Sequence, residues 1–415
     1  MLPTPPLLLV VVAVLLGGVC PAADNSGAEQ IHLSFTDDVT TIQVTYSTFQ
    51  PVKASARYGT DHVSLPGLCP GERHVYQVLG PAGWSEVFWF RAIPEGSDWS
   101  PRLAVVADMG TLTGIYSDLQ NPSTLPFLVN DTREDMYDAV LHVGDFAYDM
   151  FTDNGTKGDE FLRQIQPVAA HLPYMTCPGN HEQRANFSNY KNRFSMAGGT
   201  EGMYYSFNMG PVHFISISTE FYYFLEYGFE QVFSQYNWLR ADLAAANQRS
   251  IRNVRPWIVL FGHRPMYCSH KPNHACTEWH DRLRVGEDEF KPALPGLEHL
   301  LVSSGVDLAL WAHEHSYHRS WPVRDGTVTD TGGDPYRNPG APVHITAASA
   351  GRSTDKKPDV LQWMPWTAHR SSTEGYTRLS FHNATHMTIE QVAVGEDGAA
   401  SVIDTVTIIN DQHFT

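Results

Sequence analysis

Five polar motifs in this chain each follow directly after an apolar run, and this arrangement constrains the fold more than any other feature. The motifs are Asp108-Met109-Gly110, Gly144-Asp145-Phe146-Ala147-Tyr148, Gly179-Asn180-His181-Glu182, Phe261-Gly262-His263-Arg264-Pro265 and His313-Glu314-His315. Short apolar runs bounded by turn residues are typical of buried strands. In open α/β sheets, functional groups gather on the loops that follow the carboxyl ends of the strands. The pattern therefore predicts an α/β fold that brings these distant motifs together.

The motifs together contain the donor groups of a two-metal hydrolase: two carboxylates, a phenol, an amide oxygen and four imidazoles. Each motif alone has an inert interpretation, because Asp-x-Gly is common in turns and His-x-His pairs occur on ordinary surfaces. Five such motifs in equivalent positions, with complementary ligand types, are a poor fit to coincidence. The side chains that supply these donor groups are Asp108, Asp145, Tyr148, Asn180, His181, His263, His313 and His315.

Composition limits the possible partners of the protein. The chain has 415 residues, of which 42% are hydrophobic, so a core divided between two units is expected. The formal net charge is -17, and no run is rich in lysine or arginine. Nucleic acid would be repelled on average, so a phosphate group must be attracted locally, by metal.

Residues 1–23 are expected to form a signal peptide. The stretch from Leu7 to Leu16 is unbroken and apolar, and small residues follow it up to Ala22 and Ala23, where cleavage is expected. The stretch is shorter than the roughly 20 residues of a membrane-spanning helix, and a retained anchor is the alternative. The sequence therefore predicts a secreted or lumenal protein, the lysosome included, without stable membrane insertion.

Sequons and cysteines agree with passage through the secretory pathway. Cys268 and Cys276 bracket a short loop in which a disulfide is sterically reasonable. For Cys69 and Cys177, a free buried thiol and a bridge both remain open. The Asn-x-Ser/Thr pattern predicts glycosylation at Asn130, Asn154, Asn186 and Asn383.

Residues 24–96 are expected to form a small all-β domain. Residues 31–49 alternate polar and apolar side chains, and shorter strand-like segments follow at 74–80 and 84–92. Short strands separated by turn residues indicate a sandwich of immunoglobulin or fibronectin type. The segment 94–101, rich in proline, glycine and serine, is the natural linker to a second domain.

Residues 97–415 are expected to form the α/β domain. A hairpin is expected at 204–218, and the tail from Tyr376 to Asn410 again looks like strands. Buried-type runs at 102–108, 139–145, 258–263 and 307–313 alternate with helix-like segments at 132–140, 159–172 and 235–250.

The order of the motifs resembles that of the purple acid phosphatases, a family of metallophosphoesterases. The family pattern is Asp-x-Gly, Gly-Asp-x-x-Tyr, Gly-Asn-His-Asp/Glu, Val-x-x-His and Gly-His-x-His, and here it spans Asp108 to His315. The resemblance covers nearly all of the mature chain and is greatest to the long, plant-type form that animals also carry. The fourth and fifth motifs, Leu260-Phe261-Gly262-His263 and Ala312-His313-Glu314-His315, depart from the pattern only at non-ligand residues. The resemblance implies a four-layer catalytic domain, a β-sandwich flanked by helices, behind the all-β domain.

The resemblance also assigns the ligands to two ions, Fe(III) and a divalent metal, zinc or iron, in each subunit. Tyrosinate and carboxylate are hard anionic donors that suit Fe(III), whereas imidazoles and a neutral amide suit Zn(II) or Fe(II). The implied ligands are Asp108, Tyr148 and His315 for the ferric ion, Asn180, His263 and His313 for the divalent ion, and Asp145 as the bridge.

The implied activity is that of a secreted acid phosphatase, which hydrolyses phosphate monoesters by attack of a metal-bound hydroxide. Its substrate would be a phosphorylated small molecule or a phosphoprotein. A phosphodiesterase or nucleotide pyrophosphatase is the alternative within enzymes, and a non-catalytic binding or adhesion protein is a third interpretation.

Four further residues are expected to serve the reaction without binding metal. His181 is expected to donate to the phosphoryl oxygens or to the leaving group. His270 and His274, on the loop after His263, are candidates for substrate binding and for the same acid role, although their spacing differs from that of the family's His pair. Glu182 would either orient His181 or cap the next helix.

Overall fold

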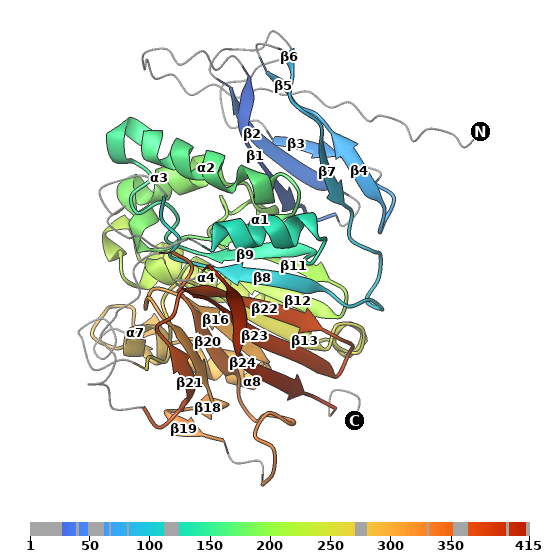
Figure 1. Cartoon of the computed structure of the whole chain (residues 1–415). Coiled ribbons are helices and arrows are strands. Elements are labelled where there is room, and N and C mark those ends of the chain that lie inside the picture. The colour runs from blue at the N-terminus through green and yellow to red at the C-terminus, as the bar shows by residue number, and fades with distance from the viewer. Residues whose placement is uncertain are drawn as a thin grey trace.

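The computed structural model describes most of the chain after the expected signal peptide (Figure 1). The signal peptide, His270, His274 and Cys276 lie outside the described residues, so the predictions made for them stay predictions. In the part that is described, no helix is both long and apolar enough to cross a membrane. The described ranges are 27–38, 41–48, 62–65, 68–80, 83–111, 124–269, 280–329, 332–351, 364–395 and 398–411.

Two mixed β-sheets form the centre of the molecule. In the first sheet, β8, β9 and β10 are parallel, whereas β22, β23 and β24 continue the sheet as antiparallel neighbours. Its order is β10 (Tyr174–Cys177), β9 (Ala139–Val143), β8 (Arg102–Val106), β22 (Gly375–Phe381), β23 (His386–Val394) and β24 (Ala400–Ile409).

The second sheet has a parallel centre, made by β12, β13, β16 and β20, and antiparallel edges. The expected hairpin is confirmed by β11 and β12, and the expected strands at 258–263 and 307–313 are confirmed by β13 and β16. Its order is β11 (Tyr205–Met209), β12 (Val212–Ser216), β13 (Trp257–Phe261), β16 (Leu308–Trp311), β20 (Val343–Ala347), β17 (Tyr317–Ser320) and β21 (Thr367–Ser371).

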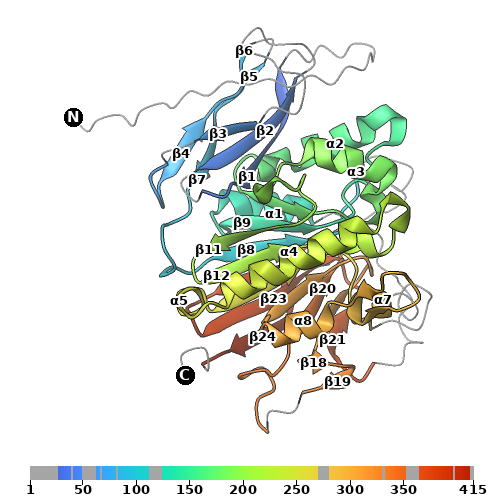
Figure 2. The same ribbon diagram turned by 180° about the vertical axis from the view of Figure 1, so that it is seen from behind.

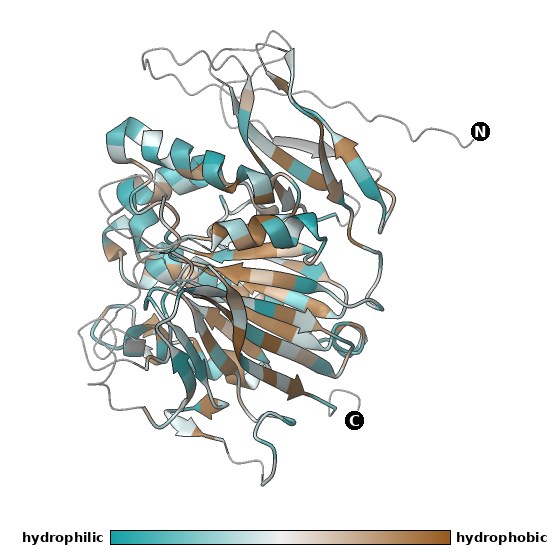
Figure 3. Cartoon of the chain, in the orientation of Figure 1, coloured by the Kyte–Doolittle hydropathy of each residue, from teal (hydrophilic) through white to brown (hydrophobic). Residues whose placement is uncertain are grey.

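The two sheets pack face to face through apolar side chains. Phe381 of β22 contacts Phe214 of β12 and Trp257 of β13, with ring centroids 5.8 and 6.3 Å apart. All three side chains are buried. Figure 3 shows hydrophobic residues concentrated on these strands, with hydrophilic residues on the helices around them. Burial of both inner faces is the main source of stability for this arrangement.

Helices cover the outer sides of the sheets. In Figure 1, α1 and α2 lie next to β9, and in Figure 2, seen from behind, α4 and α8 lie in front of the second sheet. The helices are α1 (Leu125–Arg133), α2 (Thr156–Ala169), α3 (Arg184–Arg193), α4 (Glu230–Ala246), α5 (Arg249–Arg252), α7 (His280–Arg284) and α8 (Glu298–Ser303). The small elements are η1 (Thr152–Gly155), η2 (Asn180–Glu182), η3 (Ala197–Gly199), η4 (Thr219–Tyr222), η5 (Leu225–Tyr227), β14 (Gly286–Glu287), β15 (Leu294–Pro295), β18 (Val323–Arg324) and β19 (Thr327–Val328).

The helix expected at 132–140 is wrong in position, whereas the helices expected at 159–172 and 235–250 correspond to α2 and α4. The actual helix, α1, starts earlier and has a proline in its first turn, where the missing N–H is harmless. Asp135 has a left-handed φ of 57°, so the chain turns there, and the next apolar residues enter β9. The segment expected to be a helix therefore consists of the end of α1, a turn and the start of β9.

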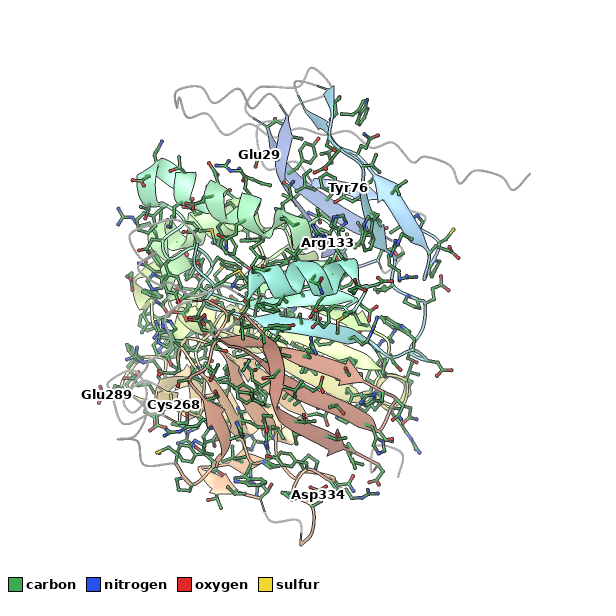
Figure 4. The ribbon with its side chains drawn as sticks, viewed as in Figure 1. Glu29, Tyr76, Arg133, Cys268, Glu289 and Asp334 are labelled. Carbon is green, nitrogen blue, oxygen red and sulfur yellow. The ribbon has the colours of Figure 1, made fainter. Side chains whose placement is uncertain are left out.

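Every regular element described before residue 93 is a strand. These strands pack directly on α2: the Tyr76 hydroxyl donates to the Ala170 carbonyl at 2.7 Å, and Glu29 pairs with Arg163. Figure 4 labels Glu29 and Tyr76 on these strands. Leu33 also forms a parallel bridge with Pro173. The strands are β1 (Ala28–Phe35), β2 (Ile42–Thr48), β3 (His62–Leu65), β4 (Arg73–Tyr76), β5 (Leu79–Gly80), β6 (Gly83–Trp84) and β7 (Phe88–Arg91). The division into domains 24–96 and 97–415 stays a prediction.

Phe381→Ala is expected to lower the free energy of unfolding by about 3–5 kcal/mol, because it leaves a cavity between the two sheets. Phe381→Leu, which keeps most of the buried volume, should cost much less. Urea denaturation followed by tryptophan fluorescence measures both. Equal midpoints for the alanine variant and the wild type would show that this contact does not hold the sheets together.

Candidate metal centre

The five polar motifs converge at the carboxyl ends of parallel strands from both sheets. Asp108 follows β8, Asp145 follows β9 and Asn180 follows β10 in the first sheet. His263 follows β13 and His313 follows β16 in the second. Because the two sheets pack face to face, their loops meet at one end of the sandwich and bring together residues separated by two hundred positions.

One group of donors consists of Asp108, Tyr148 and His315, here called the Tyr148 cluster. The Tyr148 hydroxyl donates to Asp108 Oδ1 at 3.1 Å and lies 2.8 Å from His315 Nε2. His315 Nε2 is 3.3 Å from Asp108 Oδ1. Three potential ligand atoms therefore lie close enough to one another to bind a single cation.

The second group consists of Asp145, Asn180, His263 and His313, here called the His263 cluster. His263 Nε2 lies 3.3 Å from Asp145 Oδ2 and 3.2 Å from Asn180 Oδ1. Ligand atoms of Asp145, His263 and His313 all lie within 4.8 Å of one another. The structure thus brings together the seven side chains that the resemblance implies as ligands, with Asp145, the implied bridge, in contact with His263. Their roles as metal ligands stay a prediction.

Contacts with the backbone orient the ligands and join the clusters. His263 Nδ1 is 2.9 Å from the Val143 carbonyl, which fixes that nitrogen as a donor and directs Nε2 toward the centre. The backbone N–H of His313 donates to Asp108 Oδ2 at 3.2 Å, so a residue of the His263 cluster is tied to the Tyr148 cluster.

Four of the seven candidate ligands have a left-handed backbone, which is unfavourable for residues with a side chain. Their φ angles are 56° for Asp108, 52° for Asp145, 53° for Tyr148 and 71° for His313. Such strain persists only where the surroundings impose it, and it concentrates at functional sites. The loop conformations therefore direct these side chains toward the centre, although a less strained backbone would be more stable.

Two glycines of the motifs allow the loops to approach closely. A Cβ on Gly179 would lie 2.3 Å from Asp145 Oδ1. On Gly144, which has a φ of 83°, it would lie 2.5 Å from His263 Nδ1. Any larger residue at either position would displace a candidate ligand.

Glu182 connects the loop after β9 with the loop after β10. Its buried carboxylate accepts backbone N–H groups from Asp145 at 2.9 Å, Phe146 at 3.1 Å and Gly179 at 2.9 Å. The bond from Gly179 closes the capping box of the short helix η2, of which Glu182 is itself the last residue, whereas α3, the next helix, has no side-chain cap. The hydrogen bonds of Glu182 go to the backbone of the two loops.

His181 is oriented instead by Asp149, a residue that sequence reasoning missed. His181 Nδ1 lies 3.0 Å from Asp149 Oδ1, and its Nε2 lies 4.0 Å from Asp145 Oδ2. The side chain is 33% exposed, so it borders the centre from the solvent side. The available signal was a carboxylate directly after Tyr148, but its direction depends on the left-handed φ of 77° at Asp149.

A buried ion pair lies against His313 and was also missed. Arg264 Nε is 3.0 Å from both carboxylate oxygens of Glu220, and its Nη1 is 3.2 Å from His313 Nε2. In the sequence, Arg264 has no feature that marks it except its position directly after His263. Its partner Glu220 lies on η4, about forty positions away, and no local pattern connects the two.

The electrostatics of the His263 cluster fit a cation. Burial alone would lower the pKa of His263, but the Asp145 carboxylate beside it raises that pKa to about 10. Burial opposes ionisation of Asp145, yet His263 and the neighbouring imidazoles hold its pKa well below the usual range. Burial and the positive charge of Arg264 lower the pKa of His313, which leaves a neutral imidazole free to coordinate. A proton on His263 and a metal ion are alternative ways to neutralise these donors.

The secondary predictions have mixed outcomes. Asn130, Asn154 and Asn383 are exposed and accessible to a glycan, whereas Asn186 is half-buried. Cys69 and Cys177 are free thiols, and Cys268 is disulfide-bonded, with its expected partner outside the described residues. The substrate-binding residues expected at His270 and His274 also lie outside them.

Comparison with known proteins gives consistent results. The family model described as calcineurin-like phosphoesterase matches residues 101–317, and one described as iron/zinc purple acid phosphatase-like protein C matches residues 341–405. Acid phosphatase type 7 of Danio rerio is 43% identical and that of Homo sapiens 44% identical, each over 93% of this chain and 92% of the relative. The purple acid phosphatase from seeds of yellow lupin (Lupinus luteus) has a similar fold, with a TM-score of 0.71 at 20% identity, covering 93% of this chain and 75% of that one.

Glu182→Gln is expected to weaken metal binding and to lower the free energy of unfolding by about 2–3 kcal/mol. An amide has only one accepting oxygen, so its NH2 group would face a backbone N–H. Metal content after dialysis and thermal unfolding of the metal-free protein measure the two effects. Gln183→Glu, one position along, is the matched control and should change neither the metal content nor the thermal unfolding. If Glu182→Gln behaves like the wild type in both measurements, the two loops do not depend on the Glu182 carboxylate.

Proposed function

Because this chain belongs to the purple acid phosphatase family of calcineurin-like phosphoesterases, we propose that it is an acid phosphatase that hydrolyses phosphate monoesters with a centre of Fe(III) and a divalent metal. The observation that carries this proposal is the meeting of seven donor side chains in two adjoining clusters. The phenol and carboxylate of the Tyr148 cluster suit Fe(III), and the imidazoles of the His263 cluster suit zinc or ferrous iron. Asp145, at the junction of the two loops, is the proposed bridge.

The ions would supply Lewis acidity, which lowers the pKa of water and neutralises charge on the phosphoryl oxygens. The protein would supply orientation and a proton. Asp149 holds Nδ1 of His181, so Nε2 is the nitrogen that faces the centre. A protonated Nε2 can donate to a phosphoryl oxygen or to the departing alkoxide. His181 is therefore the proposed catalytic residue, with Asp149 as its positioning residue.

The surroundings of this chemistry are also part of the proposal. The apolar amino-terminal run and the exposed asparagines of three sequons support a secreted or lumenal glycoprotein. Treatment of the mature protein from a eukaryotic host with an N-glycosidase would lower its mass if these asparagines carry glycans.

The activity is tested by metal analysis paired with rates on a monoester, a diester and a nucleotide at acidic pH. The protein is expected to contain one iron and one divalent metal and to prefer the monoester. Tyrosinate bound to ferric iron should also give a visible charge-transfer band, and Tyr148→Phe should weaken the band. A metal-replete but colourless wild type would point to a general two-metal phosphoesterase, and preference for the diester would refute the monoester assignment.

His181→Ala is expected to lower kcat by about 10²–10⁴-fold and to leave the metal content unchanged, because this side chain moves a proton and binds no ion. Asp149→Asn should lower kcat less, since an amide can still accept from Nδ1 but without charge. Elemental analysis separates the roles. Loss of metal from His181→Ala would show that this residue is a ligand.

A further inference from the structure

Two segments beside the candidate centre, residues 148–151 and 181–184, run next to each other. The ring centroids of Tyr148 and His181 are 4.5 Å apart, and Asp149 contacts His181 at 3.0 Å. One step further along both segments, the guanidinium of Arg184 lies over the ring of Phe151, 5.1 Å from its centroid. Arg184 is exposed and Phe151 half-buried. The pair therefore lies on the same two segments as the contacts of His181 with Tyr148 and Asp149.

The backbone after Arg184 is held in an unfavourable conformation. Ala185, Asn186 and Phe187 have φ angles of 53°, 52° and 62°, and each left-handed residue costs about 1–2 kcal/mol. The side chain of Phe187 is fully buried and packs edge-on against Phe221. Burial of this ring holds the strained turn, so Arg184 is fixed in place rather than carried on a loose loop.

The segment that carries Phe151 is held to the same helix. Arg193, in the last turn of α3, donates to Asp159 Oδ1 at 2.6 Å and to the Gly155 carbonyl at 2.8 Å. These bonds connect α3 to the start of α2, on the far side of the Phe151 loop. Both halves of the Arg184–Phe151 pair thus belong to one rigid unit.

The charge of Arg184 is not neutralised by any described residue. Asp149, the nearest carboxylate in sequence on the facing segment, is engaged with His181. A guanidinium held over an aromatic ring makes no hydrogen bond to that ring through its in-plane N–H groups, which can bind a phosphate in a two-point contact. In a chain with a net charge of -17, such a cation is a local attraction for anions.

We infer that Arg184, held over the ring of Phe151, binds a second phosphate group of doubly phosphorylated substrates whose first phosphate occupies the metal centre. This inference rests on the proposed phosphatase function and names a substrate class for it. His181 and Arg184 are three residues apart, so their backbones lie within about 11 Å of each other and a short linker would join the two phosphates.

The experiment compares butyl phosphate with butanediol bisphosphate, which differ only in the second phosphate, on the metal-loaded enzyme. After correction for the two equivalent phosphates, kcat/KM of the wild type should be about tenfold higher for the bisphosphate, the size of effect of a charge-assisted contact pair. Arg184→Gln should abolish this preference through KM and leave butyl phosphate within about twofold.

Two variants serve as controls. Arg184→Lys keeps the charge but not the planar fork, and it should show an intermediate preference. Arg240→Gln removes an exposed arginine from α4, so it lowers the net charge by the same amount at a distance from the site and should change neither substrate. Iron content, divalent metal content and thermal midpoint should be equal in all four proteins.

Each other outcome overturns a specific claim. A wild type that hydrolyses both substrates equally well refutes the second phosphate site and keeps the phosphatase. An equal loss on both substrates in Arg184→Gln would show that Arg184 acts through His181 or the fold. A metal-replete wild type that hydrolyses neither substrate refutes the proposed function, and the inference with it.

Discussion

The candidate site depends on one buried carboxylate. Glu182 receives N–H groups from two loops that belong to neighbouring strands, β9 and β10, and it does so directly beneath Asp145. Burial and the nearby Asp145 carboxylate disfavour the charged form of Glu182 and raise its pKa to about 8, although the backbone N–H groups act in the opposite direction. The carboxyl group therefore serves mainly to join the two loops by hydrogen bonds.

The backbone strain and the clustering of polar side chains in this pocket are both unfavourable for the protein alone. Left-handed backbones at four ligands and close approaches at Gly144 and Gly179 are unfavourable in the chain itself. The clustered carboxylates and imidazoles are equally unfavourable without a positive partner. A bound cation relieves the repulsion among the donors, and the rest of the fold compensates the strain through its large apolar core. Stability and activity therefore draw on different parts of the molecule.

The sequence predicted the ends of the strands better than the contacts between loops. Strands β8, β9, β13 and β16 were predictable because each is a short apolar run followed by a polar motif. The pairing of His181 with Asp149 was not, because it depends on backbone angles that tertiary contacts impose. The contact of Arg264 with Glu220 joins segments unrelated in sequence. Local patterns specify which side chains are available, whereas loop conformation specifies which of them meet.

The pairing of β8 with β22 has a consequence for how the chain matures on the ribosome. Val105 of β8 pairs with Thr377 of β22. The interior strand β8 therefore pairs with a strand that is synthesised some 270 residues later. Until then β8 has one open edge, although β9 and β10 can already align beside it. Open edges invite pairing with other nascent chains. The edge of β8 that faces β22 therefore stays unpaired until residues 375–381 have been synthesised.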